Sequence, residues 1–111
     1  MEALIIVAHG SKIKSSNDEI IEISNKIKNK NENTFYAFLE LSEPSFYDVL
    51  KEVVEKKYKK IKIFPYFLAA GKHVLADIPN IIKEFKTNHK DIEFNVLPHF
   101  GQCNGVEDLI L

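Results

Sequence analysis

Apolar stretches alternate with amphipathic segments along the whole chain. Four stretches have the length and residue types of β-strands: residues 3–8, 34–41, 61–68 and 91–97. The first and third are nearly continuous apolar runs, which is typical of buried parallel strands. Pro65 is unusual inside a central strand because proline has no N–H for the ladder, so we expect a bulge or a strand end there.

The segments between the strands predict helices. Isoleucines recur at helical spacing in residues 17–30, and Ser16 with Glu19 three residues later predicts a capping box at the helix start. A second helix is expected to open with Pro44 in its first turn, where proline is tolerated. The sequence Asp77-Ile-Pro79 predicts the start of a third helix, by the same argument.

This alternation predicts an α/β fold in a single domain covering residues 1–111. Right-handed crossovers and short connections favour a four-stranded, mostly parallel sheet in the order 2-1-3-4, flanked by helices on both faces. In that order the chain reverses direction between strands 1 and 3. A crevice is therefore expected at their carboxyl ends, where open α/β sheets bind ligands.

Two histidines are predicted to face that crevice. His9 directly follows the first strand, and His73 follows the third through a short segment of small residues. Imidazole binds Co(II), Ni(II), Fe(II) or Zn(II), and it also accepts protons. Two histidines with a carboxylate make an incomplete coordination shell, which could hold a metal loosely and then release it. The pattern predicts a metal or proton-transfer site.

Glu40 and Glu43 bracket the end of the second strand and are the candidate carboxylates. Glu43 is expected on the ligand-binding edge, although a favourable charge at a helix N-terminus explains it equally well. Glu40 is a charge within an apolar stretch, so it needs a partner or a position near the strand's exposed end. Lys12, Lys14 and Lys72 adjoin the two histidine segments and could attract an anionic substrate, or only keep the surface soluble.

The remaining histidines and the cysteine are expected to lie outside the site. His89 precedes the fourth strand and is expected in a solvated loop at the opposite edge of the sheet. His99 follows the fourth strand and is expected to be a surface residue, with a supporting position behind the site as the alternative. Cys103 is expected to take no part in chemistry.

Composition and charge exclude several classes of function. A formal net charge of −1 gives no support for binding nucleic acid or membranes. No apolar run approaches the ~20 residues of a bilayer span, and no signal-peptide pattern is present. One cysteine allows neither an internal disulfide nor a CxxC motif, so a cytoplasmic location is expected.

Three segments carry a distinctive combination of motifs. They are Leu4-Ile-Ile-Val-Ala-His-Gly-Ser-Lys12, Phe38-Leu-Glu-Leu-Ser-Glu-Pro-Ser-Phe46 and Phe64-Pro-Tyr-Phe-Leu-Ala-Ala-Gly-Lys-His73, the last running on to Asp77-Ile-Pro79. Together they resemble the small, CbiX-type sirohydrochlorin chelatases, which belong to the class II tetrapyrrole chelatases. The resemblance spans nearly the whole chain and implies one lobe of the class II chelatase fold.

The resemblance implies roles for individual residues. It makes His9 the residue that binds metal and takes a pyrrole proton, His73 the second metal ligand, and Glu43 a substrate contact. The loop implied to touch the macrocycle comprises Leu68, Ala69, Ala70, Gly71, Lys72 and His73. Ser11 belongs to the matching motif, and Lys12 stands where the family has arginine, which keeps the charge but loses the planar fork.

The implied reaction is insertion of a divalent metal, cobalt by family default, into sirohydrochlorin. The metal is a substrate, and no organic cofactor is implied. Because the chain resembles one lobe of larger two-lobed chelatases, a symmetric homodimer that restores the cleft is expected. The alternatives are nickel or iron on the same substrate, or a non-catalytic module that delivers metal or tetrapyrrole. A nucleotide-binding role is disfavoured because GxGxxG and P-loop motifs are absent.

Overall fold

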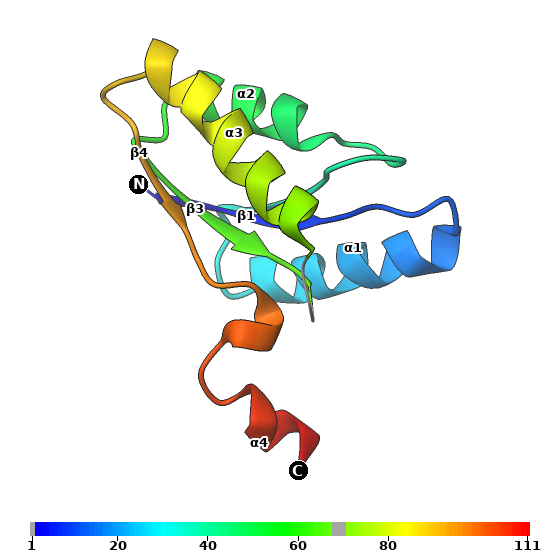
Figure 1. Ribbon diagram of the computed structural model, residues 1–111. Helices are drawn as coiled ribbons and strands as arrows, with labels where there is room; N and C mark the ends of the chain where they lie inside the picture. Colours follow the sequence, from blue (N-terminus) through cyan, green and yellow to red (C-terminus); the bar gives the residue numbers. More distant parts are fainter. Residues whose placement is uncertain (1, 68–70) are drawn as a thin grey trace.

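Four parallel strands form one sheet in the order β2-β1-β3-β4 (Figure 1). They are β1 (Glu2–Ala8), β2 (Thr34–Phe38), β3 (Lys60–Pro65) and β4 (Glu93–Val96). This computed structural model describes residues 2–67 and 71–111, the side chains of residues 72–75 excepted. The predicted α/β class and strand order are confirmed.

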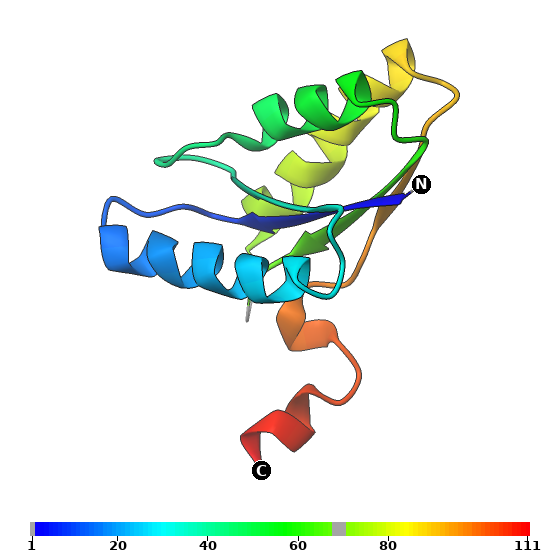
Figure 2. The same cartoon turned by 180° about the vertical axis from the view of Figure 1, so that it is seen from behind.

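Helices cover both faces of the sheet. They are α1 (Lys14–Lys28), α2 (Phe46–Glu55), α3 (Lys72–Asn88), the short η1 (Phe100–Gln102) and α4 (Val106–Ile110). Figure 2 shows α1 on one face, and α2 with α3 on the other, while α4 projects away from the sheet. Within residues 2–67 and 71–111, no helix combines the length and apolar character that a membrane span requires.

The main hydrophobic core lies between the sheet and the pair α2 and α3. Its buried members on these elements include Ala3, Ile5, Val7, Leu50, Val53, Ile61, Ile63, Ile78, Ile82 and Phe85. A smaller cluster of Ala8, Ile20 and Phe38 joins β1 and β2 to α1. Since both faces of β1 are covered, nearly all its side chains are apolar, as its continuous run predicted.

Pro65 is the last residue of β3, so the strand-end alternative is confirmed. The β3–β4 ladder closes with the Leu97 N–H donating to the Ile63 carbonyl at 2.8 Å. The ladder to β1 continues past the proline, because the Tyr66 N–H donates to the Val7 carbonyl at 2.7 Å. The missing proline N–H therefore interrupts neither ladder.

The predicted capping box at the start of α1 is wrong. The helix begins at Lys14 with Ile13 as its N-cap, and no side chain caps it. The Ser16 N–H already donates to the Ile13 carbonyl at 3.2 Å, so Ser16 lies inside the first turn rather than before it. The Ser11 hydroxyl instead accepts the Ile13 N–H at 3.0 Å. This bond links the N-cap of α1 to the loop that follows β1.

The starts of α2 and α3 also differ from the predictions. Ser45 is the N-cap of α2, and its hydroxyl accepts the Asp48 N–H at 3.1 Å, so Pro44 precedes the helix. The helix α3 begins at Lys72 rather than at Asp77, and Pro79 lies inside it. The prediction failed because proline is best tolerated in a first turn, whereas α3 accommodates it in its interior.

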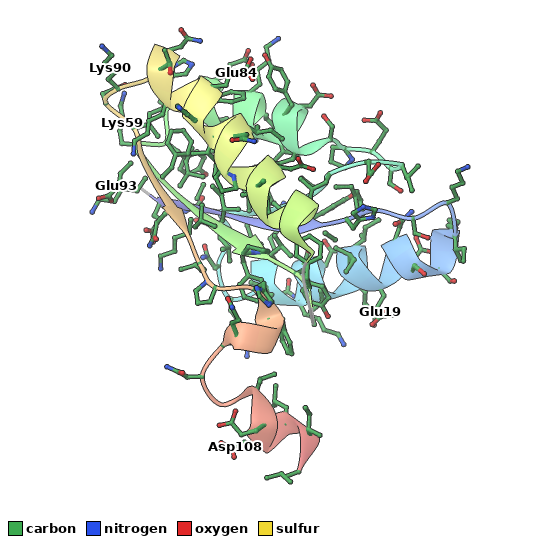
Figure 3. The ribbon with its side chains drawn as sticks, in the orientation of Figure 1. Glu19, Lys59, Glu84, Lys90, Glu93 and Asp108 are labelled. Atoms are coloured by element: carbon green, nitrogen blue, oxygen red, sulfur yellow. The ribbon has the colours of Figure 1, made fainter. Side chains whose placement is uncertain are left out.

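A salt bridge joins the amino ends of β3 and β4. Lys59 donates to the carboxylate of Asp91, and both side chains are exposed. The Glu93 N–H donates to the Lys59 carbonyl at 2.8 Å, which aligns the two strands there. Figure 3 labels Lys59 and Glu93 at this edge, opposite the edge on which the candidate site is built.

Candidate functional site

His9 and Glu40 meet beyond the carboxyl ends of β1 and β2. His9 Nε2 lies 2.6 Å from Glu40 Oε1, with the two side chains 45% and 60% exposed. The main chain reinforces the contact, because the Glu40 N–H donates to the His9 carbonyl at 2.9 Å. Glu40 therefore has the partner that its position in an apolar stretch required, and β2 itself ends earlier than predicted, at Phe38.

Both nitrogens of the His9 ring face oxygen atoms. Nδ1 lies 3.2 Å from the Gly10 carbonyl oxygen, and Nε2 faces the carboxylate of Glu40. A neutral imidazole carries its hydrogen on one of these two nitrogens, and the other nitrogen is then a lone-pair donor for a proton or a metal ion. The pair is thus suited to proton transfer and to metal ligation.

Gly10 allows the loops after β1 and β2 to approach each other. Its φ of +99° lies in the region that favours glycine. A Cβ at this position would lie 1.8 Å from the carbonyl oxygen of Glu40, which is far inside van der Waals contact. Only a residue without a side chain fits between His9 and the Glu40 backbone.

A polar cluster behind the pair ties the same two loops to α1. Asn17 Nδ2 donates to the Ser11 carbonyl and to Ser42 Oγ, both at 2.7 Å, and Asn17 Oδ1 accepts the Ser11 N–H at 3.1 Å. Ser42 Oγ donates to the Ser11 carbonyl at 2.8 Å. We call these three residues the amide clamp. The sequence analysis missed Asn17, because a polar residue on an amphipathic helix gives no signal of a contact 25 residues away.

Glu43 and Lys12 lie on the two loops but outside this hydrogen-bonded cluster. Both side chains are exposed. Within the described part of the chain, neither forms a salt bridge or a side-chain hydrogen bond. The structure thus brings Glu40, rather than Glu43, into contact with His9. The roles assigned to Glu43 and Lys12 by resemblance stay predictions.

The second predicted ligand is described only at the level of its backbone. His73 lies in the first turn of α3, which follows β3, the neighbour of β1 in the sheet. Leu68, Ala69 and Ala70 lie outside the described residues, and so do the side chains of Lys72 and His73. Among the side chains that are described, no three histidine, cysteine, aspartate or glutamate residues gather as a metal site. The convergence of His9 with His73 stays a prediction.

His99 is buried, so its prediction as a surface residue is wrong. The segment after β4 folds over the end of β3, where the Gly101 N–H donates to the Phe67 carbonyl at 3.2 Å. Phe100 packs against Tyr66, with 5.9 Å between ring centroids. The buried Nδ1 of His99 has no hydrogen-bond partner among the residues described.

His89 and Cys103 lie away from the pair. His89 ends α3 and stacks on Phe85, with 6.2 Å between ring centroids. Cys103 is partly buried, and its Sγ lies 3.5 Å from the His99 carbonyl oxygen. Neither residue has a contact that links it to His9 or Glu40 in the described part of the structure.

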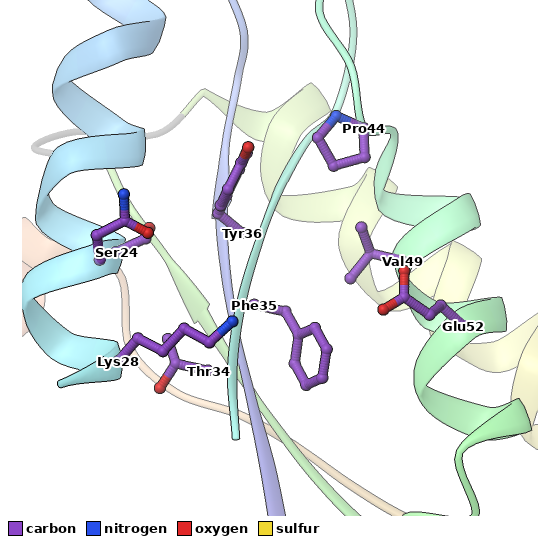
Figure 4. Close-up of a pocket in the computed structure, with 9 residues that line it drawn as sticks. Ser24, Lys28, Thr34, Phe35, Tyr36, Pro44, Val49 and Glu52 are labelled. Carbon is purple, nitrogen blue, oxygen red and sulfur yellow. The ribbon is translucent and has the colours of Figure 1, made fainter. Parts of the chain in front are cut away.

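Three hollows flank α1, one of them of about 140 Å³ and lined by Glu19, Glu22, Ile23, Lys26 and Tyr66. Another of about 180 Å³ lies beside β2, the edge strand, between α1 and α2 (Figure 4). Its lining includes Ser24, Lys28, Thr34, Tyr36, Pro44, Val49 and Glu52. The third, of about 160 Å³, is mainly apolar and is lined by Glu19, Tyr66, Phe67 and Phe100. His9 and Glu40 line none of these hollows, and their exposed side chains leave the pair open to solvent.

Known proteins resemble the chain in sequence. The family model described as CbiX matches residues 3–111. The sirohydrochlorin cobaltochelatase of Methanocaldococcus jannaschii is 34% identical over 92 residues, which cover 81% of this chain and 64% of that protein. The sirohydrochlorin cobaltochelatase of Sulfolobus acidocaldarius is 36% identical over 92 residues, covering 83% and 75%. The chloroplastic sirohydrochlorin ferrochelatase of Arabidopsis thaliana is 30% identical over 114 residues, covering 98% and 49%.

Solved structures resemble the chain in fold. A CbiX protein of Marinobacter aquaeolei superposes with a TM-score of 0.87 at 24% identity, covering 99% of this chain and 91% of that one. The sirohydrochlorin chelatase SirB of Bacillus subtilis, in complex with cobalt, gives a TM-score of 0.77 at 25% identity. That match covers 86% of this chain but 42% of SirB. The chain also spans less than two thirds of the Methanocaldococcus protein, at 64% of its length.

Proposed function

Because the chain belongs to the CbiX family, we propose that it inserts a divalent metal, Co(II) in the first instance, into sirohydrochlorin. The observation that carries the proposal is the His9–Glu40 pair at the carboxyl edge of the sheet. Metal insertion requires a base for the pyrrole protons and donors that hold the metal without retaining it. An exposed imidazole–carboxylate pair supplies both requirements.

His9 acts as metal ligand and as proton acceptor in this proposal. Its Nε2 is the ring nitrogen that faces Glu40, so a metal ion bound at Nε2 would have the carboxylate beside it. Once the metal passes to the macrocycle, the freed imidazole takes one of the two pyrrole protons, the other leaves to water, and Glu40 stabilises the imidazolium that results. The imidazolium then releases its proton to water, which restores the site for the next metal ion.

The remaining site residues complete the proposal. His73 is the second ligand, carried on α3 at the end of the strand next to β1. Glu43 and the segment Leu68–His73 contact the tetrapyrrole, and Lys12 attracts its acidic substituents. No organic cofactor takes part, because the reaction exchanges protons for a metal ion without a redox step. The cytoplasmic location expected from the cysteine content belongs to the same proposal.

We further propose that two copies of the chain enclose the substrate. The His9–Glu40 pair is open to solvent in the single chain, and SirB is long enough for more than one unit of this size. A symmetric dimer would bring a second sheet edge over the pair and exclude water from the macrocycle.

The relatives do not single out one metal among Co(II), Fe(II) and Ni(II). Cobaltochelatases and a ferrochelatase both match the chain, and imidazole with carboxylate suits Co(II), Fe(II) and Ni(II) alike. Cobalt is proposed first because the archaeal relatives carry that name.

The deciding experiment is an anaerobic absorbance assay with purified protein, sirohydrochlorin and Co(II), Ni(II) or Fe(II) in separate reactions. We expect insertion faster than in protein-free controls, over many turnovers. A spectral change limited to one equivalent would favour the delivery module instead, and no acceleration with any metal would contradict the proposal.

His9→Ala provides the matched test of the pair. General-base catalysis contributes about 10²- to 10⁴-fold, so a loss in this range is expected. His89→Ala is the control, because it removes the same ring from the far end of α3. Equal rates in the two variants would rule out the role given to His9.

A further inference from the structure

The attraction between the side chains of His9 and Glu40 does not by itself explain why they hold one geometry. Both side chains are about half exposed, and exposed ionic contacts in water are weak and rarely hold one geometry. The Ser11 carbonyl and the Ser42 hydroxyl each lie two residues beyond a member of the pair. Both are bound by one side chain, that of Asn17.

We propose that Asn17 is a positioning residue that holds the loops after β1 and β2 in register, so that His9 stays aligned with Glu40. This inference rests on the function proposed above. Every hydrogen-bonding group of the Asn17 amide is used: Nδ2 donates twice and Oδ1 accepts once. The amide binds both the N–H and the carbonyl of Ser11, as a neighbouring strand would in a β-ladder. These two bonds fix the orientation of the backbone at Ser11.

Ser42 links the second loop to the same point. Its hydroxyl accepts from Asn17 and donates to the Ser11 carbonyl, so the three residues form a closed triangle. The amide clamp thus ties the segment after Glu40 to the segment after His9, 31 residues apart, through one residue on α1. Asn17 is only partly buried and touches neither His9 nor Glu40 in the hydrogen bonds described.

Asn17→Asp is the sharpest test, because it keeps the shape of the side chain but removes both donors. An aspartate oxygen would then face the Ser11 carbonyl, two acceptors in contact. We expect kcat for cobalt insertion to fall about tenfold with little change in KM, as for a small displacement of catalytic groups. Ser42→Ala should cause a smaller loss in the same direction. Asn25→Ala, an exposed asparagine on the same helix, is the control.

Amide hydrogen exchange supplies a readout that does not depend on activity. The Ser11 N–H bonds to Asn17, and the Glu40 N–H bonds to the His9 carbonyl. The Glu40 N–H should exchange faster in Asn17→Asp, because its loop loses the bond between Ser42 and residue 17. The Ser11 N–H keeps an acceptor oxygen, and amides in the middle of β1 and β3 keep their protection. Such a local change separates positioning from a general loss of stability.

The outcomes distinguish this inference from the proposed function. If the wild-type chain inserts no metal, the proposed function fails, and the exchange rates alone decide whether the clamp holds the loops. Unchanged protection of the Glu40 amide in Asn17→Asp overturns the inference in either case. Faster exchange with unchanged kcat also overturns it, because the alignment would then be irrelevant to turnover.

Discussion

Two exposed contacts between a side-chain nitrogen and a carboxylate lie at opposite edges of the same sheet, and they differ in what surrounds them. His9–Glu40 joins the carboxyl ends of β1 and β2, whereas Lys59–Asp91 joins the amino ends of β3 and β4. The first is backed by a main-chain hydrogen bond, the close approach of Gly10 and the amide clamp. In the part of the chain that the structure describes, the second is backed by main-chain hydrogen bonds and by no cluster of side chains.

The difference separates a contact built for chemistry from one that only adds to the surface. An ammonium group keeps its proton at neutral pH, while an imidazole can exchange one or bind a metal in its place. Orientation matters only for the second kind of group, since a ligand or base must meet its substrate in a defined direction. The amide clamp and the close approach of Gly10 accompany His9, which can exchange a proton or bind a metal, and not Lys59.

The largest effect is expected from Gly10→Ala. A Cβ there overlaps the Glu40 carbonyl at 1.8 Å and must also accept a φ of +99°, so the two loops have to separate. Backbone strain of this kind costs on the order of 1–3 kcal/mol, and the separation should abolish metal insertion as well. Urea unfolding and the absorbance assay measure the two effects.

Gly105→Ala is the matched control for that change. Its φ of +88° imposes similar strain, but no atom lies within 4 Å of the added Cβ. We expect a smaller loss of stability and normal insertion. Equal losses in the two variants would mean that the contact with Glu40 has no importance.

A middle-sized effect is expected from Glu40→Gln on the binding of Co(II) alone. Metal ions and protons compete for the same nitrogen of His9, so binding of Co(II) should release protons and weaken as the pH falls. The neutral amide should lower the affinity about 10- to 100-fold, the usual loss when a metal site loses such a partner. Calorimetry in buffers of different ionisation enthalpy gives both numbers.

Glu43→Gln serves as the comparison for metal binding. It removes the same charge from the same loop, but no described contact joins Glu43 to His9. Its affinity for the free metal should stay near that of the wild type. A larger loss of Co(II) affinity in Glu43→Gln than in Glu40→Gln would mean that Glu43, rather than Glu40, supplies the carboxylate ligand.

The smallest effect is expected from Asp91→Asn. The hydrogen bond from Lys59, aided by a backbone hydrogen bond, holds the pKa of the Asp91 carboxyl below its ordinary value of 3.8. A depressed folded pKa adds stability above the unfolded pKa, and this contribution is lost as the pH falls through the folded pKa. The variant should therefore have a slightly lower Tm at pH 7 and the same Tm in strong acid.

High salt should also remove that difference, because the pair is exposed. Asp18→Asn, an exposed aspartate on α1, is the control and should leave Tm unchanged. Metal insertion should be normal in both variants. A loss of insertion in Asp91→Asn would remove the distinction between the two edges of the sheet.

Much of this arrangement could be predicted from periodicity. The alternation of apolar runs and amphipathic segments predicted the parallel sheet and its order, and the strand ends placed His9 at the ligand-binding edge. These features depend on local pattern and on general rules of chain connection. They required no knowledge of individual side-chain contacts.

The features that sequence reasoning missed depend on contacts between distant segments. The contacts of Asn17 could not be predicted, because its partners lie on two loops that meet only in the folded chain. His99 is buried within a segment whose attachment to Phe67 has no local signal in the sequence. The start of α3 was misplaced because Pro79 gave a strong local signal for a first turn that the rest of the helix overrode.

The place of β1 in the sheet has a consequence for how the chain folds. It pairs on one edge with β2 and on the other with β3, whose first residue is Lys60. Parallel pairings between distant segments form slowly, since the intervening chain must be ordered before the contacts stabilise it. The loops that carry His9 and Glu40 need only the β1–β2 pairing to meet. The contact between His9 and Glu40 thus depends on the pairing that spans the shorter stretch of chain, whereas a site that also includes His73 depends on both pairings of β1.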